Sequence, residues 1–169
     1  MTTVLFLRAK DGSAVLGADC RISDGSSVSS DKYRKLTVLD KLIFGFAGAL
    51  GPFQATQRMW EMEEISAIEE AASLRVGSGW SAVLFDANTG EAAALDADGA
   101  LVRHDTLICV GSGADIAYGF ARAHKQPRTG KEAREIVSGA IVTASERDIA
   151  TCSHYELLSV SPRGRIRAL

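Results

Sequence analysis

Cysteine and histidine are scarce in this sequence, with three residues of each among 169. An odd number of widely spaced cysteines without a CxxC pair is typical of reduced thiols rather than of a disulfide framework. The histidines show no HExxH pairing, which argues against a zinc site built from these residue types. The residues concerned are Cys20, Cys109 and Cys152, and His104, His124 and His154.

Long apolar runs and an excess of one charge are also missing. No stretch approaches the roughly 20 residues of a membrane-spanning helix, and the N-terminal apolar segment is too short for a secretory signal. The 19 Lys and Arg residues are scattered among 21 Asp and Glu residues, so no nucleic-acid-binding face is indicated. The basic residues cluster only at 163–167. We therefore expect a cytoplasmic protein with no membrane and no nucleic-acid partner.

The sequence does contain enough apolar residues for one substantial core. Apolar residues make up 46% of the chain and charged residues 24%, which is the composition of a folded globular protein. A chain of 169 residues is short for two independent domains. No internal repeat and no long linker divides it. We expect a single domain over residues 1–169.

The order of apolar patterns and turn residues predicts an α+β fold. Strands that join as hairpins imply antiparallel sheets, and two such sheets would be covered by helix layers. A Ser- and Gly-rich segment at 22–31 is expected to be a loop. Strands are expected at 4–7, 14–18, 35–39, 42–47, 80–85, 92–95, 101–103, 107–110, 155–160 and 166–169. Helices are expected at 53–64, with 65–74 as its continuation or as a second short helix, and at 115–124 and 131–147.

Thr2 is a candidate nucleophile because it follows the initiator Met1. An initiator methionine is normally removed when a small residue follows, and its removal would leave Thr2 with a free α-amino group. Such an amine has a pKa of about 7.7–8.0 and can accept the proton of the hydroxyl group on its own residue. A Met-Thr-Thr start is common, however, so it does not by itself identify an enzyme.

Several short motifs occur along the chain in one order. Taken singly, each has an ordinary explanation, such as a surface ion pair for Asp19 and Lys35 or a helix N-cap for Ser112. Taken together, they resemble the proteasome β subunits and the related bacterial HslV-type peptidases over nearly the whole length. The motifs are Met1-Thr2-Thr3-Val4, Gly17-Ala18-Asp19, Arg34-Lys35-Leu36, Gly45-Phe46-Ala47-Gly48, Val110-Gly111-Ser112-Gly113 and Arg147-Asp148.

The resemblance implies a four-layer αββα sandwich and a role for each matching residue. Thr2 Oγ would attack the peptide carbonyl, with its own α-amino group as the base. Lys35 would favour the alkoxide, Asp19 would hold Lys35, and the Gly48 N–H would stabilise the oxyanion. The remaining matches are Ser112, Asp148 and Thr151 in the polar network around the amine, with Thr151 where the family usually has Ser, and Phe46 in the first substrate pocket.

The resemblance also has implications for ions and partners. In HslV-type peptidases, carbonyl groups after the last long helix bind a monovalent cation, and the matching positions are Arg147, Ala150 and Ser153. No cofactor is expected to be required for peptide hydrolysis. The family assembles as stacked rings, with six or seven subunits expected here, and an ATP-dependent unfoldase is a possible partner. Ring size stays open because the segment between Phe53 and Trp80 is shorter than usual.

The function implied is that of a threonine endopeptidase, an N-terminal nucleophile hydrolase that degrades unfolded polypeptides inside a homo-oligomeric ring. Two alternatives remain open at this point. One is a catalytically silent ring subunit with a structural role. The other is an amidase that uses the same nucleophile on a small molecule, although such enzymes usually expose their threonine by internal self-cleavage.

Overall fold

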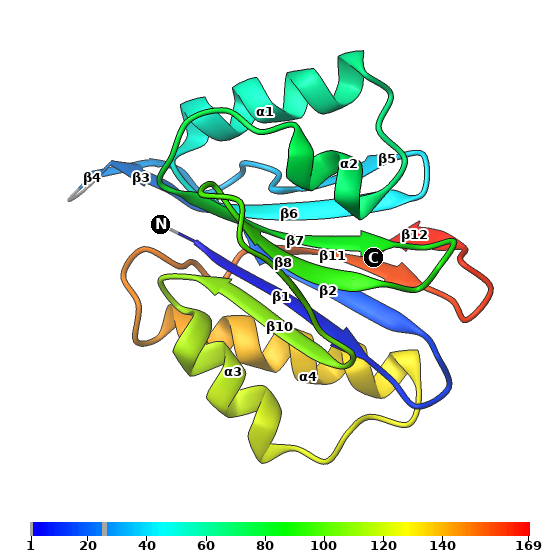
Figure 1. Cartoon of the computed structure of the whole chain (residues 1–169). Coiled ribbons are helices and arrows are strands. Elements are labelled where there is room, and N and C mark those ends of the chain that lie inside the picture. The colour runs from blue at the N-terminus through cyan, green and yellow to red at the C-terminus, as the bar shows by residue number, and fades with distance from the viewer. Residues whose placement is uncertain (1, 25–26) are drawn as a thin grey trace.

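The computed structural model describes residues 2–24 and 27–169, and Met1 lies outside this range. The chain forms strands, a helix pair, strands, a second helix pair and a final hairpin (Figure 1). The strands are β1 (Thr3–Arg8), β2 (Ala14–Asp19), β3 (Ile22–Asp24), β4 (Ser27–Ser30), β5 (Leu36–Leu39), β6 (Leu42–Gly48), β7 (Trp80–Asp86), β8 (Ala92–Asp96), β9 (Leu101–Arg103), β10 (Leu107–Gly111), β11 (Tyr155–Val160) and β12 (Ile166–Ala168). The helices are α1 (Leu50–Met62), α2 (Ile68–Ser73), α3 (Ala114–Ala123) and α4 (Gly130–Ser145).

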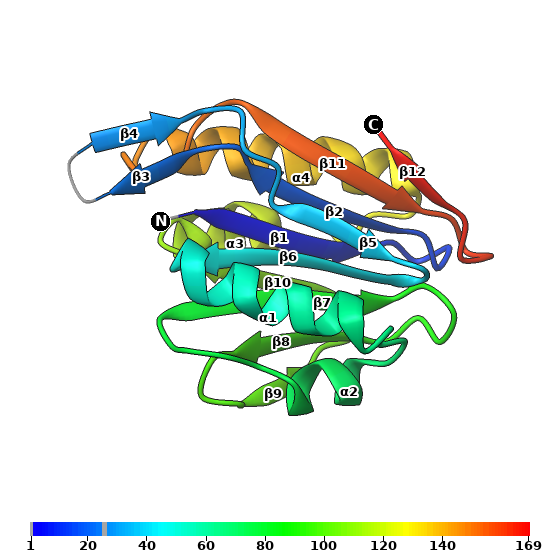
Figure 2. The same cartoon turned by 90° about the horizontal axis from the view of Figure 1, so that it is seen from above.

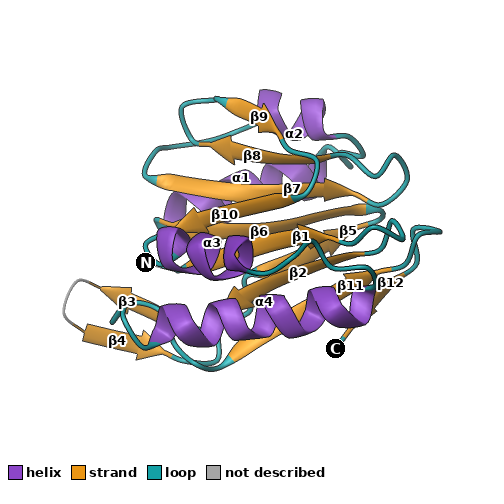
Figure 3. Ribbon diagram, turned by 90° about the horizontal axis from the view of Figure 1, so that it is seen from below, coloured by secondary structure: helices purple, strands orange, loops and turns teal. Residues whose placement is uncertain are grey.

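The strands form two five-stranded sheets that lie between two layers of helices. One sheet has the order β10-β1-β2-β11-β12 and the other the order β5-β6-β7-β8-β9. The strand pairs within both sheets are antiparallel. Helices α1 and α2 cover the outer face of the second sheet, and α3 and α4 cover that of the first (Figures 1 and 3). The predicted four-layer αββα sandwich is therefore confirmed.

The side chains of β1 show how one strand serves two layers. Successive side chains of a strand point to opposite faces. Val4 and Phe6 pack between the two sheets, whereas Leu5 and Leu7 pack against α3 and α4. Because both faces of β1 are covered, its sequence is a continuous apolar run rather than an alternating one. A third apolar cluster lies between the second sheet and helices α1 and α2.

One local expectation was wrong. The segment at 22–31 is not only a loop, since it contains the hairpin of β3 and β4. Strand β4 is largely exposed. Its serine-rich sequence therefore lacks the apolar alternation by which a half-buried strand is recognised. The strand expected at 107–110 is present as β10, and it pairs with β1 rather than with the strands that immediately precede it in the sequence. The sheet that a strand joins depends on which sheet edge is free. The local sequence carries no information about this.

The start of β1 is held firmly on both sides. Thr3 is paired with Gly111 of β10, and Val4 is paired with Ala18 of β2. Chain ends fray unless a sheet ties them down, so these two ladders fix the start of β1, which lies at one end of the sandwich (Figure 2), and with it the adjoining Thr2. No helix among the described residues is long and apolar enough to cross a membrane.

Candidate active site

Thr2, Asp19 and Lys35 lie together at this end of the sandwich. The Lys35 ammonium donates to Thr2 Oγ1 at 2.5 Å and to Asp19 Oδ1 at 3.1 Å. The side chains of Lys35 and Asp19 are 1% and 0% exposed. Burying two charges is costly unless they are paired and hydrogen-bonded. The sequence-predicted contact between these three residues is therefore present as a buried, mutually dependent cluster.

Asp19 connects several backbone segments at the end of β2. Its Oδ1 accepts a hydrogen bond from the Thr3 N–H at 2.7 Å, and its Oδ2 accepts one from the Arg21 N–H at 2.9 Å. The same carboxylate thus holds the segment next to Thr2 and the chain that leaves β2. These bonds satisfy the carboxylate lone pairs that Lys35 does not use, as a buried anion requires.

The charge of Lys35 is sensitive to its surroundings. Burial lowers the pKa of the Lys35 ammonium, and the Asp19 carboxylate opposes this effect without cancelling it. The carboxylate favours the charged ammonium form, which can stabilise an anion, whereas burial makes it easier for the ammonium to lose its proton. Lys35 is therefore suited to stabilising a negative charge that develops on Thr2 Oγ1, only 2.5 Å from its nitrogen.

A second polar cluster contains Ser112, Asp148 and Thr151. Asp148 Oδ2 accepts hydrogen bonds from the hydroxyl groups of Ser112 at 2.5 Å and Thr151 at 2.7 Å. Burial would raise the pKa of Asp148, but these hydrogen bonds, with that of the Ala150 N–H, lower it overall. Thr151 Oγ1 also lies 2.7 Å from Thr3 Oγ1. The methyl group of Thr151 thus does not prevent its hydroxyl from joining the network beside the start of β1.

Gly48 and Phe46 line cavities beside Thr2. Two cavities of about 260 and 130 Å³ are both lined by Thr2 and Gly48. Gly48 is exposed and has a φ of 109°, and a Cβ built on it would lie 2.3 Å from the Gly79 carbonyl oxygen. Glycine is therefore needed there. Phe46 lines the smaller cavity and stacks on Phe53 with ring centroids 4.0 Å apart.

The loop after α4 contains the carbonyl groups predicted to bind a monovalent cation. Within the described part of the chain, the carbonyl oxygens of Arg147, Ala150 and Ser153 accept no hydrogen bond. Unpaired carbonyl oxygens are suitable ligands for a hard cation. The donor set thus fits such an ion, and cation binding stays a prediction.

Glu156 belongs to this site although no motif in the sequence points to it. Its Oε1 accepts hydrogen bonds from the N–H groups of Lys35 and Leu36, the latter at 2.7 Å. It reaches them from β11, more than a hundred residues further along the chain. Burial is the main cause that raises the pKa of the Glu156 carboxyl group, while the same two N–H groups oppose it. Glu156 is thus a positioning residue for Lys35, and no local motif could have identified it.

Replacing Glu156 separates its role as a hydrogen-bond acceptor from its charge. Glu156→Ala leaves two buried N–H groups unpaired, so the free energy of unfolding should fall by about 2 kcal/mol or more. Glu156→Gln keeps an acceptor and should be tolerated. Because the folded-state pKa of Glu156 is raised above its unfolded-state value, its contribution to the free energy of unfolding is complete below the unfolded-state pKa and is lost as the pH rises through the folded-state pKa. Urea unfolding from pH 4 to 8 should therefore show that the free energy of unfolding of Glu156→Gln increases relative to that of the wild type as the pH rises.

A comparison with known protein families now adds to this geometry. A family model described as proteasome subunit matches residues 76–160, slightly more than half of the chain. The matched segment contains Ser112, Asp148 and Thr151. It does not contain Thr2, Asp19 or Lys35, so the family match and the geometry around Thr2 are separate observations.

Proposed function

Because this chain belongs to the proteasome subunit family, we propose that it is a catalytically active threonine endopeptidase subunit with Thr2 as its nucleophile. The observation that carries the proposal is the 2.5 Å contact between the Lys35 ammonium and Thr2 Oγ1 inside a buried ion pair with Asp19. A subunit with a purely structural role has no need for a buried ammonium directed at a threonine hydroxyl. Met1 lies outside the described residues, and its removal remains part of the proposal.

The proposed reaction forms and breaks two bonds at the peptide carbonyl carbon. The Thr2 Oγ–H proton passes to the α-amino group of Thr2 while Oγ bonds to the carbonyl carbon. The oxyanion is stabilised by the Gly48 N–H, and Lys35 stabilises the developing charge on Oγ. Collapse of this intermediate breaks the C–N bond, and the leaving amine takes the proton. A water molecule then hydrolyses the Thr2 ester by the same steps.

The two cavities beside Thr2 support a polypeptide substrate. Both are lined by Thr2 and Gly48, one also by Phe46 and the other also by Trp80 and Ser112. An extended chain would therefore pass Thr2 with side chains on both sides of the scissile bond. Family members assemble as stacked ring oligomers, which favours a homo-oligomer here. Enclosure in rings of six or seven HslV-type subunits, supply by an ATP-dependent unfoldase and cation binding by the loop after α4 belong to the same proposal.

Intact mass measured before and after treatment with a peptide epoxyketone tests this function. This reagent reacts with both the hydroxyl group and the free amine of an N-terminal threonine. We expect the purified chain to lack Met1 and to gain one inhibitor mass. Thr2→Ala should lose this gain, because alanine still permits removal of Met1 but provides no nucleophile.

Thr2→Ser is the matched control, since it retains a hydroxyl group on a small residue and should still be labelled. A chain that lacks Met1 but stays unlabelled would contradict an active peptidase. It would support the alternative of a structural ring subunit.

A further inference from the structure

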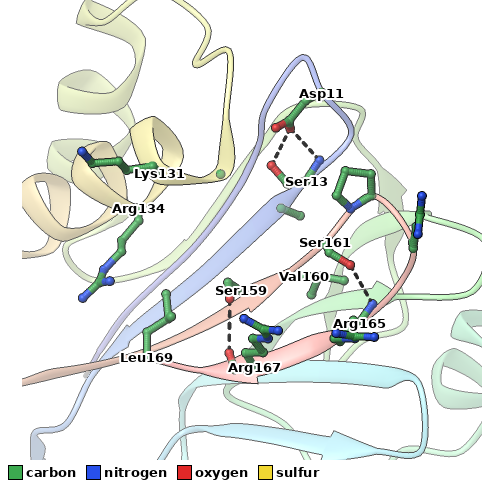
Figure 4. A pocket seen from close by; sticks show the side chains of 14 residues that line it. Asp11, Ser13, Lys131, Arg134, Ser159, Val160, Ser161, Arg165, Arg167 and Leu169 are labelled. Carbon is green, nitrogen blue, oxygen red and sulfur yellow. Dashed lines mark hydrogen bonds between the residues drawn. The ribbon is translucent and has the colours of Figure 1, made fainter.

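A large cavity lies at the end of the sandwich opposite Thr2. Its volume is about 710 Å³, and it shares no lining residue with the two cavities beside Thr2. It is formed where the β1–β2 turn, the first turn of α4 and the β11–β12 hairpin meet (Figure 4). The six residues of β1, about 20 Å of extended chain, separate this turn from the candidate active site. The cavity is therefore a separate site.

The lining of this cavity is strongly basic. Asp11 carries the acidic side chain among its lining residues. Asp11 Oδ1 already accepts hydrogen bonds from the Ser13 N–H at 2.9 Å and the Ser13 hydroxyl at 2.5 Å, and these bonds lower the pKa of Asp11. The five cationic residues that line the cavity, all exposed, are Lys131, Arg134, Arg163, Arg165 and Arg167.

These five side chains have no anionic partner in the described part of the chain. None of them forms an ion pair or donates a side-chain hydrogen bond there. Arginine residues elsewhere do pair, as Arg21 does with Asp31 at 2.7 Å and Arg103 with Glu69. Like charges around one cavity repel one another unless an anion balances them. The unpaired cluster therefore points to a multivalent anion.

Three features define the chemistry of this anion. Four of the five cations are arginines, whose planar guanidinium groups bind phosphate through two parallel hydrogen bonds. The cavity volume lies within the range of about 300–1,000 Å³ that is usual for small ligands. No aromatic side chain is among the 14 lining residues, so the cavity offers no surface on which a nucleotide base could stack.

We propose that this cavity binds a short chain of linked phosphates, of the kind found in inorganic polyphosphate. Such a chain supplies several negative charges in a compact shape, and each phosphate can accept bonds from more than one guanidinium group. Figure 4 shows Arg134 on one side of the space and Arg165 and Arg167 on the other. A phosphate chain would therefore bridge α4 and the β11–β12 hairpin.

Isothermal titration calorimetry with tripolyphosphate tests this site on the full-length protein. We expect saturable binding of one tripolyphosphate per chain at low ionic strength, weakened by added salt because exposed charges are screened. The double variant Arg165→Gln/Arg167→Gln should bind about tenfold more weakly or worse, because two charge-assisted contacts are lost. Both side chains are exposed and make no side-chain hydrogen bond, so this variant should fold with an unchanged melting temperature.

The matched control is Arg58→Gln/Arg122→Gln, which removes two exposed charges from α1 and α3 and should bind tripolyphosphate as the wild type does. Equal weakening in both double variants would overturn the proposal, because it would show general charge attraction. ATP should bind no more tightly than tripolyphosphate, and much tighter ATP binding would overturn the inorganic source. Tight binding of an oligoglutamate peptide, without binding of tripolyphosphate, would overturn the proposed phosphate ligand in favour of an acidic polypeptide. None of these measurements depends on peptide hydrolysis.

Discussion

Lys35→Met should reduce peptide hydrolysis by about 10²–10³-fold, the range seen when one preorganised group that stabilises transition-state charge is removed. The physical reason is the loss of the ammonium that lies 2.5 Å from Thr2 Oγ1. The same change leaves the Asp19 carboxylate buried without its cationic partner, so stability should fall as well, by about 3–5 kcal/mol. Steady-state rates with a fluorogenic peptide and urea unfolding measure the two effects separately.

A second variant distinguishes catalysis from folding. In Asp19→Asn/Lys35→Met both charges are absent, so much of the lost stability should return while the rate stays low. Lys125→Met, which removes an exposed lysine after α3, is the matched control and should change neither quantity. Recovery of the rate together with the stability would mean that Lys35 has only a structural role.

Gly111→Ala should have the other large effect, because the glycine lies directly against the nucleophile. Gly111 has a φ of 103°, and an added Cβ would lie 1.9 Å from the carbonyl oxygen of Thr2. The backbone must then move, and the free energy of unfolding should fall by about 2–4 kcal/mol from strain and overpacking. A shift of Thr2 by about 1 Å is expected to reduce the peptidase rate by about 10²-fold.

Gly90→Ala is the matched control for backbone strain. Gly90 also has a positive φ, of 77°, but an added Cβ would meet no atom within 4 Å. It should cost about 1–2 kcal/mol from the left-handed conformation alone and leave the rate unchanged. If both alanine variants reduced the rate equally, the contact between Gly111 and Thr2 would not explain the loss.

Much of the fold could be predicted because its elements carry local signals. The hairpin of β1 and β2 was recognisable from two apolar runs around Asp11-Gly12, and the hairpin of β5 and β6 from the runs around Asp40-Lys41. Helix α4 was recognisable from its apolar spacing after a break at residues 127–130. In each case the residues that decide the element are neighbours in the chain. The hairpin of β3 and β4 was missed because its exposed serines lack that pattern.

Only some residues of the candidate site could be predicted from the sequence. Thr2, Asp19 and Lys35 were selected through resemblance to a family, since no periodicity brings together residues 33 positions apart. Their hydrogen bonds, their burial and the direction of the Lys35 pKa shift come from packing alone. Glu156 was not predicted, because its contact with Lys35 spans 121 residues and no local sequence pattern indicates it.

The local sequence thus accounts for most strands, turns and helix bounds of this protein, because apolar patterns and turn residues act over a few positions. The three-dimensional packing decided that β10 joins the sheet of β1, that Glu156 holds Lys35, and that basic side chains from α4 and the β11–β12 hairpin surround one cavity. Those contacts depend on which apolar faces are buried together. Those faces belong to segments from distant parts of the chain. Residues far apart in sequence therefore come into contact without any local signal.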